Sequence, residues 1–211
     1  MKRIALPVLA ALALAGCAKG GALDFEAPPE MRWRALVTEQ DRDRLRNWRK
    51  AWEAALPQAR LADAATIARE GALFQPDQAM ANAMPPQGDY QCRTFKLGAK
   101  RPGLRTFTAL PAVNCRVGRA GEVPVLVTLD GVQRPMGRLY AETEARVVFL
   151  GTLELGDENV PLEYSRDALR DIAGYVERIG TRRWRLVMPW PAFESQLDVV
   201  ELVPGGARNP N

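Results

Sequence analysis

The sequence predicts a mainly β fold, an antiparallel meander that closes into a small barrel, with one or two N-terminal α-helices packed on it. Three observations predict this fold. From residue 90 onward, segments of five to eight residues alternate between apolar and polar side chains, which is typical of strands. Turn signals separate these segments at short intervals, which favours sequential hairpins. Apolar residues recur at helical spacing mainly in the part of the chain before residue 75.

The first element is a short apolar segment at the start of the chain. Two basic residues precede an apolar run over 4–13, and Leu14–Cys17 follows it. The run is shorter than the about 20 residues that a membrane-spanning helix needs, and its basic start is typical of a cleaved secretory segment. The pattern resembles a bacterial lipoprotein signal peptide over 1–16, with Cys17 as the first mature residue. An ordinary secretory signal with an accidental cysteine is the alternative.

The resemblance to lipoproteins implies a lipid anchor. Cys17 would carry a diacylglyceryl group on its sulfur and an acyl group on its amino terminus. Each buried methylene adds about 0.8 kcal/mol of membrane affinity, so several chains anchor stably. Ala18, and not an aspartate, follows Cys17. In the lipoprotein pattern this implies sorting to the outer membrane, with the body of the protein in the periplasm. Residues 17–30 contain Gly20–Gly21 and Pro28–Pro29, which predict a flexible tether.

The first predicted helix begins at Thr38, a typical N-cap residue. An apolar stripe follows at helical spacing and includes Trp48 and Trp52. We expect this stripe to pack on the protein's own domain, and a basic amphipathic helix that lies on a membrane is the alternative. Pro57 should end or kink the helix.

A second, short helix is predicted from the cap residue Asp63 to Glu70, with Gly71 as its stop signal. Residues 75–88 contain three prolines and predict a long loop. The expected organisation of the whole chain is a signal peptide (1–16), a lipidated N-terminus and tether (17–30), one globular domain (31–203, with a helical and loop part over 31–88 and a β part over 89–203) and a disordered tail (204–211).

The clearest hairpin spans Val123–Tyr140 and turns at Asp130–Gly131. A short helix is plausible at Ser165–Arg170. About eight candidate strands in sequential hairpins favour closure, because a barrel has no unpaired edges. We therefore expect a lipocalin-like barrel, closed or partly open, and an open sheet or sandwich is the alternative. The other strand candidates are 146–155, 173–179, 182–188 and 197–203.

Composition limits the function classes. Of 29 basic side chains, Lys2 and Arg3 lie in the predicted signal, which leaves 27 against 25 acidic ones and disfavours a nucleic-acid partner. The chain has no histidine, so Ser-His-Asp and Cys-His catalysis are excluded and catalytic zinc is disfavoured. Neither serine begins an SxxK box, and no nucleotide-binding glycine motif occurs. We expect no cofactor and no metal.

Two cysteines remain once Cys17 is assigned to the anchor. In an oxidising compartment, Cys92 and Cys115 are expected to form a disulfide. The bridge would contribute about 3–4 kcal/mol in the chain-entropy model. A metal or redox role is the alternative, which the absence of a CxxC spacing disfavours.

Two arginine patterns are candidate binding sites. On a strand, Arg183 and Arg185 share one face and Trp184 lies on the other, so the patch is a candidate contact for an anion or a glycan. Arg134 and Arg138 also share a face and are candidates for clamping a carboxylate or phosphate. The alternative for both patterns is structural: Trp184 in the core and arginines that are solvated or paired outside.

Carboxylates in predicted turns are candidates for glycoside hydrolysis, which needs two acids about 5–10 Å apart. Solvated turn residues are the expected alternative. The acids are Glu142, Glu144, Asp157 and Glu158.

Several short stretches together resemble one family, the small bacterial envelope proteins classed as domain of unknown function 4893. The resemblance covers nearly all of the mature chain, and no single stretch is specific alone. It implies one domain, a secreted context and the paired cysteines, and no activity or catalytic residue. The stretches are 33–36, 41–52, 88–93, 96–98, 133–135, 149–152, 176–180, 193–195, 197–199 and 201–204.

These observations predict a non-enzymatic outer-membrane lipoprotein that binds a small ligand or a protein partner in the periplasm, with inhibition of a protein as one version. Its expected partners are the membrane, through Cys17, and an unknown periplasmic ligand or protein. The alternatives are a carboxylate-based cell-wall glycan hydrolase and an envelope structural or assembly factor that docks through Trp48 and Trp52.

Overall fold

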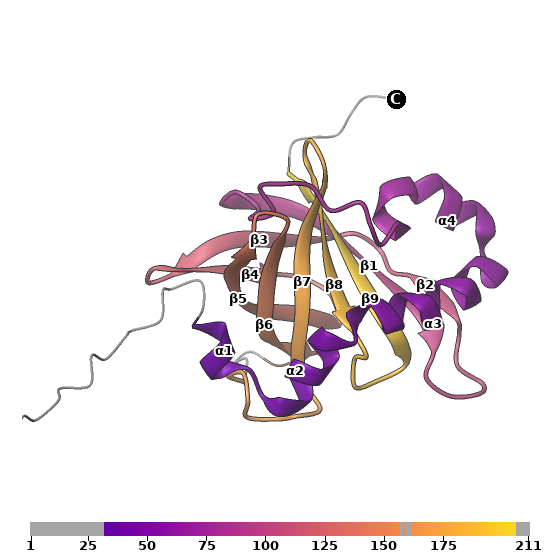
Figure 1. The fold of residues 1–211 in the computed structure, drawn as a ribbon, viewed down its shortest axis with the longest axis horizontal. Helices are drawn as coiled ribbons and strands as arrows, with labels where there is room; N and C mark the ends of the chain where they lie inside the picture. Colours follow the sequence, from indigo (N-terminus) through magenta and orange to yellow (C-terminus); the bar gives the residue numbers. More distant parts are fainter. Residues whose placement is uncertain (1–31, 157, 159–161, 206–211) are drawn as a thin grey trace, which may run out of the picture.

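The protein is a closed antiparallel β-barrel with helices on its outer surface (Figure 1). The computed structural model describes residues 32–156, 158 and 162–205. The predicted signal, Cys17, the tether and Asp157 lie outside these residues. The strands are β1 (Gly88–Ala99), β2 (Phe107–Ala109), β3 (Val113–Ala120), β4 (Val123–Thr128), β5 (Gln133–Thr143), β6 (Arg146–Leu155), β7 (Asp171–Gly180), β8 (Arg183–Pro189) and β9 (Ser195–Pro204).

Eight of these strands form the barrel, in the order β1-β3-β4-β5-β6-β7-β8-β9, and β9 pairs back with β1 over its whole length. Every pairing is antiparallel and nearly every connection is a hairpin. β2 is an extra strand that is not part of the barrel and pairs with residues 95–97 of β1. The predicted closed meander is therefore confirmed, and closure leaves few unpaired strand edges.

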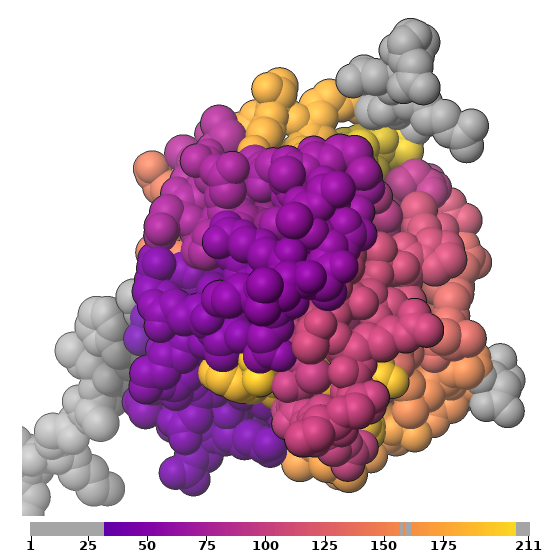
Figure 2. All heavy atoms as spheres, turned by 90° about the vertical axis from the view of Figure 1, so that its right-hand side faces the viewer, coloured from indigo at the N-terminus to yellow at the C-terminus, as the bar shows by residue number. Residues whose placement is uncertain are grey.

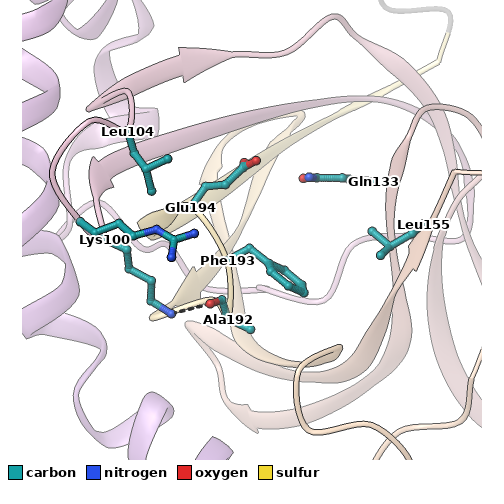
Figure 3. Close-up of a pocket in the computed structure, with 8 residues that line it drawn as sticks. Lys100, Leu104, Gln133, Leu155, Ala192, Phe193 and Glu194 are labelled. Atoms are coloured by element: carbon teal, nitrogen blue, oxygen red, sulfur yellow. Dashed lines mark hydrogen bonds between the residues drawn. The ribbon is translucent and has the colours of Figure 1, made fainter.

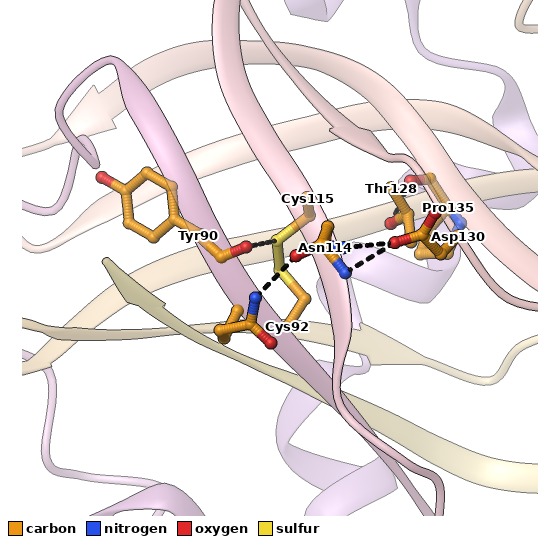
Figure 4. Close-up of a disulfide and its surroundings, with 8 residues drawn as sticks. Tyr90, Cys92, Asn114, Cys115, Thr128, Asp130 and Pro135 are labelled. Carbon is orange, nitrogen blue, oxygen red and sulfur yellow. Dashed lines mark hydrogen bonds between the residues drawn. A yellow bond between two sulfur atoms is a disulfide. The ribbon is translucent and has the colours of Figure 1, made fainter. Parts of the chain in front are cut away.

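Alternation along the strands separates an apolar interior from the outer surface. The interior core includes Tyr90, Phe149, Trp184 and Leu202, all at most 5% exposed. The predicted disulfide between Cys92 and Cys115 is confirmed and joins β1 to β3 inside this core, with 5.9 Å between the Cα atoms (Figure 4). It closes a loop between the first two adjacent barrel strands.

The helices cover part of the outer surface (Figure 2). α3 (Trp48–Ala62) packs on β1 and β9, where Trp52 is 1% exposed, and α2 (Glu39–Arg46) packs on β7 through Leu45. Gly98 has φ +66°, and a Cβ there would lie 2.8 Å from the Cα of Ala55, so glycine permits this close approach. None of the described helices is long and apolar enough to span a membrane. The helices are α1 (Trp33–Leu36), α2 (Glu39–Arg46), α3 (Trp48–Ala62), α4 (Ala64–Glu70) and the 3-10 helix η2 (Gly71–Phe74).

The predicted helix caps are confirmed. Thr38 Oγ1 accepts from the backbone N–H of Asp41, and the Asp63 side chain accepts from that of Thr66. Gly71 ends α4 with φ 55°.

Three expectations are corrected. Pro57 does not end α3, which continues to Ala62, and the kink expected as the other outcome stays a prediction. Pro57 and the residue four positions earlier are exposed, so water can hydrate the carbonyl that proline leaves unpaired. Residues 165–170 form turns instead of a helix, because the Asp171 carboxylate binds the N–H of Ser165 and holds it at φ 70°. Pro204 still pairs with Tyr90, so the described chain stays in the sheet to the start of the predicted tail.

The two ends of the barrel differ. One end, near the β7–β8 hairpin at the top of Figure 1, is crossed by the loop 75–87. In this loop, Met80 N donates to Arg178 O, Ala83 N donates to Glu144 O, and Ala83 packs into the interior core. We call this the closed end. We call the other end, where the β1–β2, β4–β5, β6–β7 and β8–β9 connections meet, the open end.

Candidate functional site

The candidate site lies at the open end, where inward-facing positions change from apolar to polar. Along β1 the inward series is Tyr90, Cys92, Thr94 and Lys96, and along β9 the buried apolar positions lead to Asp198. Lys96 and Asp198 are direct cross-strand partners. The barrel therefore brings a cation and an acid together just inside its opening.

Lys96 is the centre of a polar cluster in which Asp198 and Ser195 are buried and Glu194 is exposed. Its Nζ lies 3.4 Å from Oδ2 of Asp198 and 3.2 Å from Oε2 of Glu194. The hydroxyl of Ser195 donates to Oδ1 of Asp198. Burial raises the pKa of Asp198, although Lys96 and Ser195 oppose the rise. This carboxyl therefore holds its proton to higher pH than an ordinary aspartate.

The open end is hollowed in three adjoining places of about 590, 350 and 40 Å³, which we call the mouth cavity. Gln133 lines all three. Figure 3 shows the largest part, with Leu104 and Glu194 on one side and Leu155 on the other. The two larger hollows each lie within the range of small-molecule sites, which are usually about 300–1,000 Å³.

The β1–β2 loop and the β8–β9 loop are joined across the rim of this cavity. The ammonium group of Lys100 donates to the carbonyl oxygen of Ala192 (Figure 3) and to that of Pro191. Burial lowers the pKa of Lys100, and the nearby Arg44 adds to this effect. These contacts fix one wall of the mouth cavity by backbone atoms of the opposite loop.

The predicted patch on β8 lies away from this cavity. Trp184 is in the barrel interior at the closed end and forms an edge-to-face contact with Tyr90 at 6.2 Å. Arg185 is fully buried on the outer face, with Nη2 2.7 Å from Glu177 Oε2, and it also donates to carbonyls in the segment 72–76. These contacts correspond to the structural alternative, and the binding role of this patch stays a prediction.

Arg183 is also paired with carboxylates of the protein itself. Its Nε donates to Oε1 of Glu201 at 2.5 Å, and its Nη2 lies 3.0 Å from Oε2 of Glu70. The same two carboxylates also bind Arg93, so the four side chains form one network between α4 and the barrel. The network holds the end of α4 to the barrel.

Arg134 and Arg138 share the outer face of β5, and their role as a clamp for an anion stays a prediction. Arg134 Nη2 lies 3.1 Å from Glu154 Oε1, and its guanidinium also donates to carbonyls of Gly131 and Gly156. Arg138 is exposed and borders a shallow outer groove with Met136.

The predicted acids that the structure describes are divided between the two ends of the barrel. Glu142 lies near the end of β5 and Glu144 lies in the turn to β6, both at the closed end, and burial raises the pKa of Glu142. Glu158 follows β6 near the open end and pairs with Arg170. In the part of the chain that the structure describes, no group of three or more Cys, Asp or Glu residues could hold a metal ion.

The two tryptophans proposed for docking face the protein itself. Trp52 lies on the buried face of α3, and its ring lies against the Arg185 guanidinium. Trp48 is partly buried and packs edge-to-face with Tyr175 at 6.3 Å, with the Arg146 guanidinium over its ring at 4.0 Å.

The residues of the mouth cavity were not predicted from the sequence. A signal for two of them was present, since Lys96 is in phase with Cys92 and Asp198 is in phase with the apolar Val200 and Leu202. A charged residue at an inward-facing position near a strand end indicates the solvent-accessible end of a barrel. Phe193 lies in the β8–β9 loop and Gln133 is the first residue of β5. At such positions the sequence pattern does not show whether a side chain faces the barrel interior.

The family model described as domain of unknown function (DUF4893) matches residues 33–202 of this chain. Comparisons with curated proteins and with solved structures found no match. The matched region includes all eight barrel strands, the disulfide and the cluster around Lys96, since it ends two residues before the end of β9. The chain therefore belongs to the DUF4893 family.

Proposed function

We propose that this protein is a bacterial outer-membrane lipoprotein, anchored through Cys17, whose barrel faces the periplasm and binds a small ligand at its open end without catalysing a reaction. The signal pattern over 1–16 supports the anchor. The buried disulfide between Cys92 and Cys115 supports an oxidising compartment, because cytosolic thiols are kept reduced.

One observation carries the binding function: the barrel is filled at one end and hollow at the other. The closed end is occupied by Trp184, Tyr90 and the loop 75–87. The open end has the mouth cavity, with the polar cluster around Lys96 at its base. A concave site that combines apolar walls with a few convergent polar groups is the usual form of a small-molecule site.

Mass spectrometry of the mature protein, purified from membranes of a Gram-negative host, tests the anchor. We expect an N-terminal peptide that begins at an acylated Cys17. An unmodified N-terminus at any other residue would refute the anchor and the outer-membrane location.

Native mass spectrometry of the protein released from envelopes tests the binding function. We expect a small molecule to co-purify, to be lost in the variant Gln133→Trp, which fills the mouth cavity, and to remain in Leu61→Trp. Leu61 is a matched control because it lies on α3 and is 91% exposed. Crosslinking in intact envelopes that captures one stoichiometric protein, with no small molecule and no effect of Gln133→Trp, would favour a protein-binding or inhibitory role instead.

A glycan hydrolase is the second candidate, because Glu194 and Asp198 both contact Lys96 at the base of the cavity. A carboxyl with a raised pKa, such as that of Asp198, suits a general acid. Incubation with purified peptidoglycan separates the two functions. Release of soluble glycan fragments that is abolished by Asp198→Asn and by Glu194→Gln would replace the binding proposal, whereas we expect no release.

A further inference from the structure

The two larger parts of the mouth cavity are strongly biased toward positive charge. Their walls contain four cationic side chains and one carboxylate, that of Glu194. The single carboxylate is already engaged, since it lies 3.2 Å from the ammonium group of Lys96. The cations are Lys96, Lys100, Arg101 and Arg105.

Two of these cations are available to a ligand. Arg101 and Arg105 lie in the β1–β2 loop and are exposed. Within the described residues, neither guanidinium has a hydrogen-bond or ion-pair partner, whereas Lys96 and Lys100 are both held by protein groups. A guanidinium presents several donors in a fixed plane, which matches the geometry of carboxylate and phosphate groups. The rim therefore offers a site for an anion.

The base of the cavity does not cancel this charge. Asp198 is 7% exposed and already accepts from Ser195 and Lys96. Its raised pKa, caused by burial, reduces the negative charge that it contributes. A cationic ligand group would therefore meet Lys96 and the rim arginines without a free carboxylate to receive it.

The rest of the cavity wall is apolar. Leu104, Leu155 and Phe193 line the largest part, and Phe193 remains 40% exposed (Figure 3). Val132 lines the neighbouring part and is 73% exposed. Large apolar side chains exposed at the edge of a cavity mark a surface that is covered when a ligand binds.

We infer that the mouth cavity binds a single-chain anionic amphiphile, with its carboxylate or phosphate head on Arg101 and Arg105 and its hydrocarbon chain between Leu104, Leu155 and Phe193. This inference rests on the proposed binding function and adds the chemical class of the ligand. The head requires the two unpaired guanidinium groups, and the chain requires the apolar wall.

Calorimetric titration with dodecanoate and dodecyl phosphate, below their micelle-forming concentrations, tests this inference. The protein is the full chain carrying Cys17→Ser, purified without detergent so that no competing amphiphile is present. We expect one molecule bound per chain. Dodecyltrimethylammonium and dodecanol, which share the chain, and acetate and inorganic phosphate, which share the head, should bind at least about tenfold more weakly, a difference of about 1.4 kcal/mol.

Variants assign the site. The double variant Arg101→Gln/Arg105→Gln should weaken dodecanoate binding by about tenfold or more and leave dodecanol binding unchanged. Arg60→Gln is the matched control, since Arg60 is exposed on α3 and distant in the sequence from the mouth. Gln133→Trp should abolish binding of dodecanoate, and circular dichroism checks that each variant is folded.

Several results would overturn the inference. Equal or tighter binding of dodecyltrimethylammonium or dodecanol would refute the anionic class but leave the proposed binding function standing. Binding of dodecanoate that survives Gln133→Trp would place the amphiphile elsewhere. Arginine-dependent binding to phosphatidylglycerol vesicles, without binding of free dodecanoate, would assign the rim to a lipid surface. Failure of the binding function itself is seen separately, as the absence of any co-purifying small molecule.

Discussion

The two ends of the barrel are made from the same eight strands but are finished in opposite ways. At the closed end, aromatic side chains fill the interior, and the loop 75–87 is tied across it by backbone hydrogen bonds to Arg178 and Glu144. At the open end, the interior positions carry Lys96 and Asp198, and large apolar side chains remain exposed on the connecting loops.

The difference indicates where stability and function lie. Burial of close-packed aromatic side chains stabilises the fold. Exposed apolar side chains contribute little to stability, and a buried ion pair can cost free energy. A chain under selection for stability alone would fill both ends alike. The contrast therefore favours the open end as the working end, and substitutions at matched positions can test it.

The largest effect is expected for Trp184→Ala at the closed end. Removing a buried tryptophan side chain typically costs about 3–5 kcal/mol of unfolding free energy, and Trp184 is 5% exposed in the interior core. Phe193→Ala at the open end should cost no more than about 0.5 kcal/mol, since its ring is 40% exposed. Urea unfolding of both variants gives the comparison.

Trp184→Phe serves as the conservative control, because the buried indole Nε1 has no hydrogen-bond partner in the described structure. Phenylalanine keeps most of the apolar contact and removes the unpaired donor, so its cost should be smaller than that of alanine. Equal costs for Trp184→Ala and Phe193→Ala would end the distinction between the two ends.

Removal of the disulfide ranks next. The double variant Cys92→Ala/Cys115→Ala should lose about 3–4 kcal/mol, because the bridge closes a loop with a sequence separation of 23 residues. Both sulfurs lie in the interior core that continues to the closed end. We therefore expect the urea midpoint to fall while ligand binding at the mouth, measured on the folded variant, stays within about twofold. A larger loss of binding than of stability would show that the two ends are coupled.

The sequence predicted the barrel well because the information for it is local. Strand period, turn signals such as Asp130–Gly131 and the short spacing of hairpins all act between neighbouring residues. The cap residues Thr38 and Asp63 act in the same way and are also confirmed. The helix end expected at Pro57 was wrong because the effect of proline depends on solvent access to one carbonyl, which only the packed helix determines.

The candidate site was not predicted, because it depends on which distant residues meet. The arginines selected from the sequence find carboxylates on other elements, as Arg185 does with Glu177 and Arg183 with Glu70. Conversely, Lys96 and Asp198 are about a hundred positions apart and become neighbours only through the closure of β9 on β1. Clusters of arginines were visible in the sequence. The pair of opposite charges where β9 closes on β1 was not.

A smaller effect, seen as a pH dependence, is expected for Asp198→Asn. The folded-state pKa of Asp198 is raised above its ordinary value of 3.8, so ionisation of this group costs stability. The stability of the native protein relative to the variant should be greatest below about pH 4 and should fall as pH rises, levelling off above the folded-state pKa. Urea unfolding of both proteins from pH 3 to pH 8 measures this difference. A difference that grows with pH would mean that the pair with Lys96 dominates over burial.

The smallest effect on stability, within about 0.5 kcal/mol, is expected for Val132→Ser at the rim. Val132 is 73% exposed, so serine removes little buried apolar surface from the folded state. Leu61→Ser on α3, where Leu61 is 91% exposed, should be equally neutral in urea unfolding. The two variants separate in ligand binding: Val132→Ser should weaken dodecanoate binding because Val132 borders the mouth cavity, and Leu61→Ser should not. If Val132→Ser instead destabilises the fold by 1 kcal/mol or more, on the scale of an ordinary core substitution, the open end is structural and the contrast between the ends is wrong.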